Sequence, residues 1–313
     1  MDLRQIENII AIEREQSISK AAEKLFLTQS ALNQQLLRLE KELGLPLFER
    51  RNHSMIPTFA GKIYLATAHR MLDMKSETYK ILCDILDETS GEISVTYSPE
   101  RGSLMFSEIF PIFHRKYPNV TFHIQEAHAK KMENLVLTKE VTLACFAYQN
   151  DQINPLLDHI DTKKELMVLG VPESHPLAHL AGPESYKTLP EIDLSLFKNE
   201  PFALISRLTR MRDMADLAFR HAGFSPKILF ESSNTYTAVN MVKNQVCSAF
   251  FPQSYVDPLA PIVYFTAVPR QSWQQCVAYL KGSYLTKPEK FFIQLVKAYG
   301  DGTLSHIMQT LPL

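Results

Sequence analysis

Residues 17–61 constrain the fold more than any other stretch, because they hold two helix-forming segments separated by a short break at residues 26–28. The first segment carries Ala21 and Ala22, whose small side chains let two helices cross closely. The second segment is amphipathic, with one apolar and one polar face. Its apolar face is formed by Leu32, Leu36 and Leu39. The pattern predicts a helix-turn-helix whose polar face is free to enter a DNA groove.

The polar face of the second segment carries amide and hydroxyl groups. These residues are Gln29, Ser30, Asn33 and Gln34. Amide side chains can make paired hydrogen bonds to adenine, and Ser can bond base edges or phosphate. Ser19, Lys20 and Thr28 are expected to contact phosphate, and Ser19 and Thr28 are also candidate helix caps. A merely solvated helix face is the alternative.

Segment 46–58 is expected to form a short two-stranded wing with a polar tip. Arg50, Arg51 and His53 lie on it and suit contacts to the flanking DNA backbone or minor groove. An exposed basic loop is the alternative. Charge adds a constraint, since residues 1–58 contain eight Lys or Arg and eight Asp or Glu. We therefore expect modest non-specific DNA affinity, with specificity that depends on dimeric docking.

Further residues fall at the spacing of a known family. They are Leu45-Pro46-Leu47-Phe48-Glu49-Arg50 and Pro57-Thr58-Phe59-Ala60-Gly61. With the two helices, the run from Met1 to Gly61 resembles the winged helix-turn-helix of LysR-type transcriptional regulators. The chain departs from the family pattern at three positions, where the family usually has Pro, Ser and often Arg. This chain has Ser30, Asn33 and Gln34 there, so the operator sequence cannot be borrowed from a relative.

The segment from Thr58 to about Glu88 predicts one long helix, because it lacks Pro and its only Gly is Gly61. Apolar residues on it repeat every three and four positions, with Lys75 as the polar member. The apolar members are Leu65, Ala68, Leu72, Tyr79, Leu82 and Leu86. The resemblance implies that this helix pairs two subunits. An amphipathic helix packed on its own core is the alternative.

After Ser90-Gly91, short apolar runs alternate with helical stretches, which predicts α/β lobes with largely parallel sheets. This region resembles the effector domain of the same family, of the type 2 periplasmic-binding-protein-like fold with two Rossmann-like lobes. The resemblance is carried by Ser98-Pro99, Gly102-Ser103, Phe113-x-x-x-Tyr117-Pro118, His175-Pro176-Leu177-Ala178 and Phe251-Pro252. Where the family commonly has two glycines before its last such strand, this chain has Gln245 and Cys247.

The expected organisation is multidomain. Residues 1–58 form an all-α winged helix-turn-helix domain, 59–89 a dimerisation helix and 90–313 the α/β effector domain. Lobe I is expected to span about residues 90–162 and 267–313, and lobe II about residues 163–266.

Ligands of open α/β sheets bind beyond the carboxyl ends of strands, where helix N-termini favour anions. Loops at such places carry eight candidate effector-binding residues. They are Ser98, Arg101, Gly102 and Ser103 in lobe I and Ser206, Thr209, Arg210 and Asn234 in lobe II. The hydroxyls and arginines lean towards a small anion. Ordinary turn and cap residues are the alternative.

Composition argues against a membrane-spanning, an exported and a metal-binding protein. The chain has no run of eighteen apolar residues and no basic-apolar leader, so a cytoplasmic protein without a membrane span is expected. Four widely spaced cysteines favour buried free thiols over a disulfide or metal framework, although a redox pair stays open. His175 and His179 have no third ligand nearby, and Pro176 between them favours a loop. No metal or cofactor is expected.

The leading interpretation is a DNA-binding regulator, not an enzyme, that binds operator DNA as a homodimer or homotetramer. A small-molecule effector in the interlobe cleft would control it, and RNA polymerase is a further candidate partner. An enzyme with an appended helical domain is disfavoured, because the chain shows no nucleophile elbow or phosphate loop. A solute-binding protein would need an export signal. The same regulator with a degenerate pocket and no effector is the remaining alternative.

Overall fold

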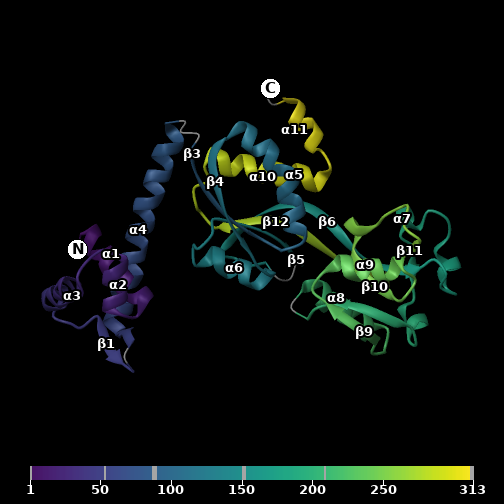
Figure 1. Ribbon diagram of the computed structural model, residues 1–313, viewed down its shortest axis with the longest axis horizontal. Helices are drawn as coiled ribbons and strands as arrows, with labels where there is room; N and C mark the ends of the chain where they lie inside the picture. The colour runs from purple at the N-terminus through teal and green to yellow at the C-terminus, as the bar shows by residue number, and fades with distance from the viewer. Residues whose placement is uncertain (1, 53, 87–89, 150–152, 208, 311–313) are drawn as a thin grey trace. The chain divides into compact units, whose positions relative to one another are not determined.

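The computed structural model describes residues 2–52, 54–86, 90–149, 153–207 and 209–310. The chain forms two compact units, Met1–Glu88 and Thr89–Leu313 (Figure 1). We refer to them as the N-terminal and C-terminal units and describe each separately. Among the described residues, no helix is long and apolar enough to cross a membrane.

The N-terminal unit is a helical bundle with a β-hairpin. Its elements are α1 (Leu3–Glu15), α2 (Ile18–Lys24), α3 (Gln29–Leu43), β1 (Phe48–Arg51), β2 (Ser54–Pro57) and α4 (Phe59–Ile85). Ala21 and Ala22 are fully buried where α2 crosses α1 and α3. Leu32, Leu36 and Leu39 on α3 join the same core. The apolar face expected from the sequence therefore packs inward, which leaves the other face of α3 exposed.

Side-chain caps set the helix boundaries of this unit. Thr28 caps α3 by accepting a hydrogen bond from the backbone N–H of Ala31 at 3.2 Å. The cap of α2 is Ser17, whose hydroxyl accepts from the N–H of Lys20. The prediction of Ser19 as a cap was wrong, because Ile18 already lies in the helix and Ser19 is inside its first turn.

The hairpin is the expected wing. Strands β1 and β2 pair in antiparallel register from Phe48↔Pro57 to Arg51↔Ser54, and Asn52 follows the end of β1. The long helix α4 then starts tightly against the hairpin's base. A Cβ on Gly61 would lie 1.9 Å from the carbonyl oxygen of Leu47, so only glycine fits this close approach.

The C-terminal unit is built on one ten-stranded mixed sheet of order β4-β3-β5-β12-β6-β10-β8-β9, with β11 pairing β6 and β7. Its strands are β3 (Ser90–Tyr97), β4 (Asn119–Glu126), β5 (Leu143–Tyr148), β6 (Leu157–Pro172), β7 (Glu191–Ile192), β8 (Pro201–Ile205), β9 (Lys227–Ser232), β10 (Ser248–Pro252), β11 (Ile262–Ala267) and β12 (Ser272–Leu280). Its helices are α5 (Arg101–Lys116), α6 (Ala129–Leu137), η1 (Ala178–Ala181), α7 (Ser185–Thr188), η2 (Leu194–Phe197), α8 (Arg210–His221), α9 (Thr235–Lys243), η3 (Gln253–Tyr255), α10 (Lys287–Asp301) and α11 (Leu304–Thr310).

Two lobes share this sheet. Lobe I contains parallel β3, β4 and β5, covered by α5 and α10 on one face and α6 on the other (Figure 1). Lobe II contains parallel β8, β9 and β10, with α8 and α9 on opposite faces. The largely parallel arrangement predicted from the sequence holds within each lobe. It fails where the lobes join, because the long strands there pair antiparallel.

The join between the lobes is formed by β6 and β12. Strand β6 pairs with β12 over Leu157–Leu166 and with β10 and β11 over Met167–Pro172. The chain therefore passes from lobe I to lobe II inside a single strand. It returns between the end of β11 at Ala267 and the start of β12 at Ser272.

Candidate functional site

The first two turns of α3 carry the amide and hydroxyl side chains expected to read DNA. Gln29, Ser30 and Gln34 are exposed, and Asn33 is half-buried. The hydroxyl of Ser30 lies 3.2 Å from that of Thr28. Because the buried leucines hold α3 from behind, these polar groups stand together on the exposed face of the helix.

Other predicted DNA contacts flank α3. Ser19 and Lys20 are exposed at the start of α2. Arg50 and Arg51 are exposed on β1, where Arg51 pairs with Glu49 at 2.8 Å. His53 lies outside the described residues.

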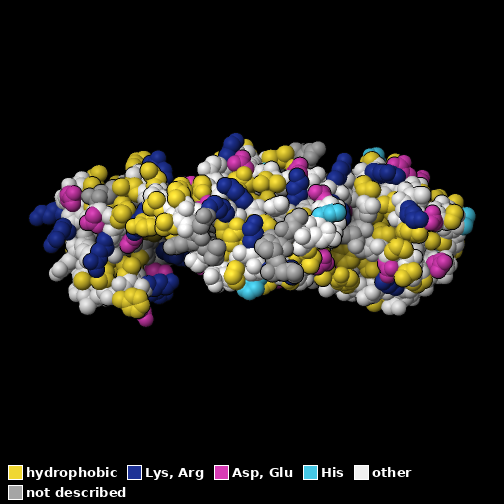
Figure 2. All heavy atoms as spheres, turned by 90° about the horizontal axis from the view of Figure 1, so that it is seen from above, with side chains coloured by type: hydrophobic (Ala, Val, Ile, Leu, Met, Phe, Trp, Pro, Cys, Tyr) yellow, Lys and Arg dark blue, Asp and Glu magenta, His cyan; other side chains and the backbone are white. Residues whose placement is uncertain are grey.

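Figure 2 shows Lys and Arg side chains of the N-terminal unit interspersed with Asp and Glu on the face in view. This agrees with the equal counts of basic and acidic residues over positions 1–58. This surface therefore has little excess positive charge. Any recognition of DNA by it would depend on the positions of its hydrogen-bonding groups.

Helix α4 divides the predicted dimerisation seam into two parts. Leu65 and Ala68 are 3% and 0% exposed inside their own unit, so they are not available to a partner subunit. The polar member of the seam, Lys75, pairs with Glu7 of α1 at 2.9 Å. This half of the seam covers α1, which corrects the expectation for Leu65 and Ala68.

Beyond α1 the seam is largely uncovered. Leu72 is half-buried, whereas Tyr79, Leu82 and Leu86 are 63%, 50% and 70% exposed. Further large apolar side chains of α4 are exposed as well. They are Phe59, Ile63, Met74 and Ile85. A helix with so much exposed apolar surface is typical of one that packs against a partner.

The lobe I candidates lie at the end of β3 and the start of α5. Gly102 packs on Tyr97, and an added Cβ would lie 2.4 Å from the Tyr97 ring, so its small size serves packing. The Ser103 hydroxyl donates to Pro99 O at 2.5 Å and contacts Glu126 at 2.9 Å. Ser98 is half-buried, and its side chain makes no hydrogen bond to any described residue.

Arg101 is not a free cation. Its guanidinium pairs with Glu165 of β6 at 2.5 Å, and Glu165 is completely buried. The same carboxylate accepts from the Gln275 amide at 2.6 Å and from the Ser254 N–H at 3.0 Å. A buried carboxylate therefore already balances the charge of Arg101, and a role for Arg101 in effector binding stays a prediction.

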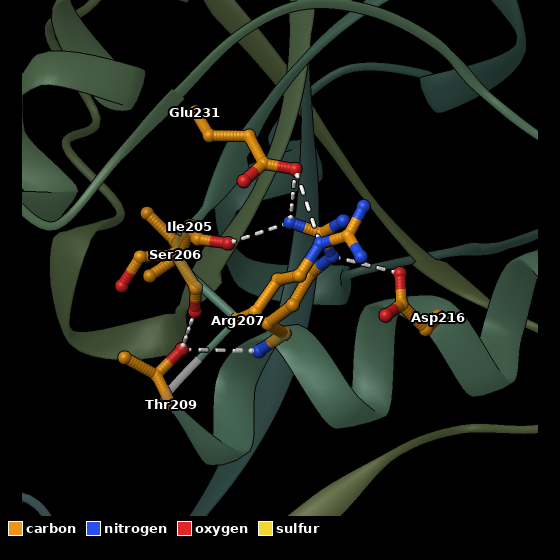
Figure 3. A network of polar contacts seen from close by, with 7 residues as sticks. Ile205, Ser206, Arg207, Thr209, Asp216 and Glu231 are labelled. Atoms are coloured by element: carbon orange, nitrogen blue, oxygen red, sulfur yellow. Dashed lines mark hydrogen bonds and ion pairs between the residues drawn. The ribbon is translucent and has the colours of Figure 1, made fainter.

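The lobe II candidates surround the loop between β8 and α8. The Thr209 hydroxyl donates to Ser206 O at 2.9 Å and accepts from the Arg212 N–H at 3.3 Å, so it caps α8 (Figure 3). Arg210 reaches lobe I, where it pairs with Glu133 at 3.2 Å. Asn234 caps α9 by accepting from the Thr237 N–H.

Two of the predicted effector-binding residues have side-chain hydroxyls without a hydrogen bond to the described residues. The Ser206 side chain, like that of Ser98 in lobe I, makes no hydrogen bond to the described part of the chain. The two serines follow β8 and β3, at the carboxyl ends where open sheets bind ligands. The other predicted residues hold the surrounding loops in place.

Three polar residues at the lobe junction were missed by sequence reasoning. Glu100 accepts hydrogen bonds from lobe II, Tyr255 supplies one of them, and Glu165 binds Arg101. The only signal available was the position of Glu100 beside Arg101. Pairing over more than sixty residues of sequence, as between Arg101 and Glu165, leaves no local pattern.

The cysteines are all free thiols. Cys145 on β5 and Cys276 on β12 lie on neighbouring strands but pack into cores on opposite faces of the sheet. Burial raises the pKa of the Cys145 thiol to about 12 and also raises the pKa of Cys276. Neither is disposed to form a thiolate or to bridge to the other.

Gln245 stands where the family commonly has glycine and adopts a left-handed conformation with φ 63°. Its side chain accepts from the N–H and hydroxyl of Ser174 at 2.9 and 2.7 Å, and donates to Pro261 O at 2.8 Å. These bonds tie down the strained turn, so the loss of the glycine is compensated locally.

Two family models cover most of the chain. The model for bacterial regulatory helix-turn-helix proteins of the lysR family matches residues 3–62, and that for the LysR substrate binding domain matches residues 86–301. The chain belongs to the LysR family. It is therefore a transcriptional regulator with DNA-binding and effector-binding domains, and not an enzyme.

Individual LysR proteins agree with this assignment. The regulator YybE of Bacillus subtilis (strain 168) is 26% identical over 301 residues, covering 95% of this chain and 98% of its own. A full-length variant of OxyR from Pseudomonas aeruginosa matches with a TM-score of 0.65 at 19% identity, over 99% of this chain and 95% of that chain. Full-length CbnR in complex with its target DNA matches with a TM-score of 0.53 at 19% identity, over 95% and 99%.

Proposed function

We propose that this LysR-family chain is a cytoplasmic, sequence-specific regulator that binds operator DNA as a dimer or a tetramer. The observation that carries the proposal is the row of exposed and half-buried amide and hydroxyl groups on the first two turns of α3, held by a buried leucine face. Recognition-helix residues of this kind contact base edges in the major groove. The determined complex of CbnR with its target DNA supports the same use of the fold.

The exposed apolar part of α4 supports pairing of two subunits through Tyr79, Leu82 and Leu86. A dimer would offer two recognition helices to half-sites separated by one or more helical turns. Assembly of dimers into a tetramer, and contact with RNA polymerase, are extensions of the same proposal.

In the C-terminal unit we propose a small-molecule effector between the lobes, bound in part by the hydroxyls of Ser98 and Ser206. An effector would act by preferring one lobe arrangement over another, since a ligand shifts an equilibrium only through its difference in affinity for the two states. Arg101 and Arg210 are already paired with carboxylates, so free arginines do not supply a reason for the effector to be an anion. The effector's identity is left open.

The test uses genomic fragments captured by the purified full chain, followed by fluorescence anisotropy on the enriched sequence. Gln29→Ala and Asn33→Ala should each weaken binding by roughly tenfold to a hundredfold, because a paired amide–base contact contributes about 1–3 kcal/mol. Leu43→Ala, exposed at the last residue of the same helix and off the face of Ser30 and Asn33, is the matched control and should bind normally. Undiminished binding by both amide variants would refute the assignment.

A further inference from the structure

One carboxylate joins the two lobes of the C-terminal unit with both of its oxygens. Glu100, in lobe I just before α5, accepts from the backbone N–H of Thr235 at 2.8 Å and from the Tyr255 hydroxyl at 2.6 Å. Thr235 is the first residue of α9 and Tyr255 ends η3, so both donors belong to lobe II. No ion pair joins Glu100 to a cation among the described residues, and its partners here are two neutral donors.

These two donors form a place suited to a carboxylate. The first N–H of a helix carries partial positive charge, and hydrogen bonds to an ionised carboxylate are stronger than neutral ones. Burial and the bond to Glu100 raise the pKa of Tyr255, so its hydroxyl stays protonated and donates. The Tyr255 ring packs edge-on against Tyr236 at 5.1 Å between centroids, which fixes the direction of the hydroxyl.

The nearby arginines do not compete for Glu100. Arg101 is held by the buried Glu165, and Arg210 pairs with Glu133. The Arg210–Glu133 pair is another direct bond between the lobes, from α8 to α6. Glu100 therefore has a separate part in the lobe contact, and removing it would expose two lobe II donors without disturbing either arginine pair.

We propose that Glu100 is an internal ligand of lobe II: it holds the lobes together, and a carboxylate-bearing effector binds by taking over its two donors. The binding of an effector at this place rests on the proposed effector control, whereas the role of Glu100 in holding the lobes together does not. The effector class follows from the chemistry of the donors, which already bind a carboxylate of the chain itself.

The first test is amide hydrogen exchange at Thr235 in the full chain. In Glu100→Ala this amide loses its acceptor, and its exchange should accelerate by roughly tenfold or more. Glu126→Ala is the matched control, because Glu126 is a carboxylate of lobe I whose contact with Ser103 stays within lobe I. Unchanged exchange at Thr235 in Glu100→Ala would overturn the proposal. Tyr255→Phe keeps the Thr235 bond and should accelerate exchange less, which separates a local effect from unfolding.

The second test is rescue of Glu100→Ala by acetate, compared with sodium chloride at equal ionic strength. Acetate should slow Thr235 exchange again in Glu100→Ala, and the rescue should be weaker in Glu100→Ala combined with Tyr255→Phe. Wild-type exchange should not respond. Failure of acetate to slow exchange in Glu100→Ala would contradict a free carboxylate at this place. Neither test uses DNA, so failure of operator binding would leave these results unaffected.

Discussion

Arg212 is the residue that most clearly anchors the loop between β8 and α8, which carries Ser206 of the proposed effector site. Its side chain is 4% exposed and pairs with Asp216 and Glu231, each at 2.8 Å. Its guanidinium also donates to Ile205 O at 3.2 Å, while its backbone N–H donates to the Thr209 hydroxyl. A buried guanidinium with all of these bonds holds the end of β8 against the start of α8, and so positions Ser206 between them.

Replacing Arg212 by Met should lower the free energy of unfolding by about 1–3 kcal/mol, because the buried Ile205 carbonyl loses its donor and two carboxylates lose their cation. Denaturant unfolding measures the change. Arg207→Ala is the control, since Arg207 lies 3.7 Å from the same Glu231 with its side chain 76% exposed. It should change stability little. Equal losses for the two variants would contradict the anchoring role.

The same contact predicts a pH dependence. The hydrogen bond from Arg212 holds the pKa of Glu231 below its ordinary value of 4.5. The unfolded chain therefore binds a proton at higher pH than the folded chain, and this stabilisation is complete above about pH 4.5 and lost as the pH falls through the lowered pKa. The stability difference between wild type and Arg212→Met should shrink over that acid range. A difference that is constant or grows would exclude the mechanism.

Among the elements, α4 shows what an apolar repeat can and cannot predict. Its three-and-four spacing correctly indicates one long helix with a face to bury. It does not say what covers that face, and here α1 covers the Leu65 and Ala68 half. Burial by the same chain and burial by a partner satisfy the same periodicity, so only tertiary structure separates them.

The exposed half of the seam carries the dimerisation prediction. A double variant, Tyr79→Glu and Leu82→Glu, should weaken self-association by about tenfold or more, because charges would enter an apolar contact; analytical ultracentrifugation measures this. Leu65→Ala should leave self-association intact while lowering the free energy of unfolding by about 2–5 kcal/mol. Unchanged self-association of the double variant would mean that the dimer interface does not include Tyr79 and Leu82.

For the remaining elements too, some features follow from local sequence patterns and others from contacts between residues far apart in sequence. The helix-turn-helix, the wing and the strand–helix alternation follow from short-range patterns, and the family assignment agrees with them. Capping by Thr28 and Asn234 is likewise local. The pairing of Arg101 with Glu165, and the bonds of Glu100 to lobe II, join residues far apart in sequence. Sequence could predict the loops of the proposed effector site but not which of their side chains already bind other residues of the chain.

For the whole molecule, the sheet determines which parts should unfold together. Strand β6 runs through both lobes and pairs with β12 in lobe I and with β10 and β11 in lobe II, so the lobes share one hydrogen-bonded sheet. The N-terminal unit has a hydrophobic core of its own and is a separate compact unit.

We therefore expect two calorimetric transitions for the full chain at micromolar concentration, one for each unit. Leu65→Ala should lower the Tm of only one transition, because its cavity lies in the N-terminal core. Arg212→Met should lower only the other, since its partners all belong to lobe II. A single transition shifted by both variants would mean that the two units unfold as one, and a third transition would mean that the lobes unfold separately despite the strands that they share.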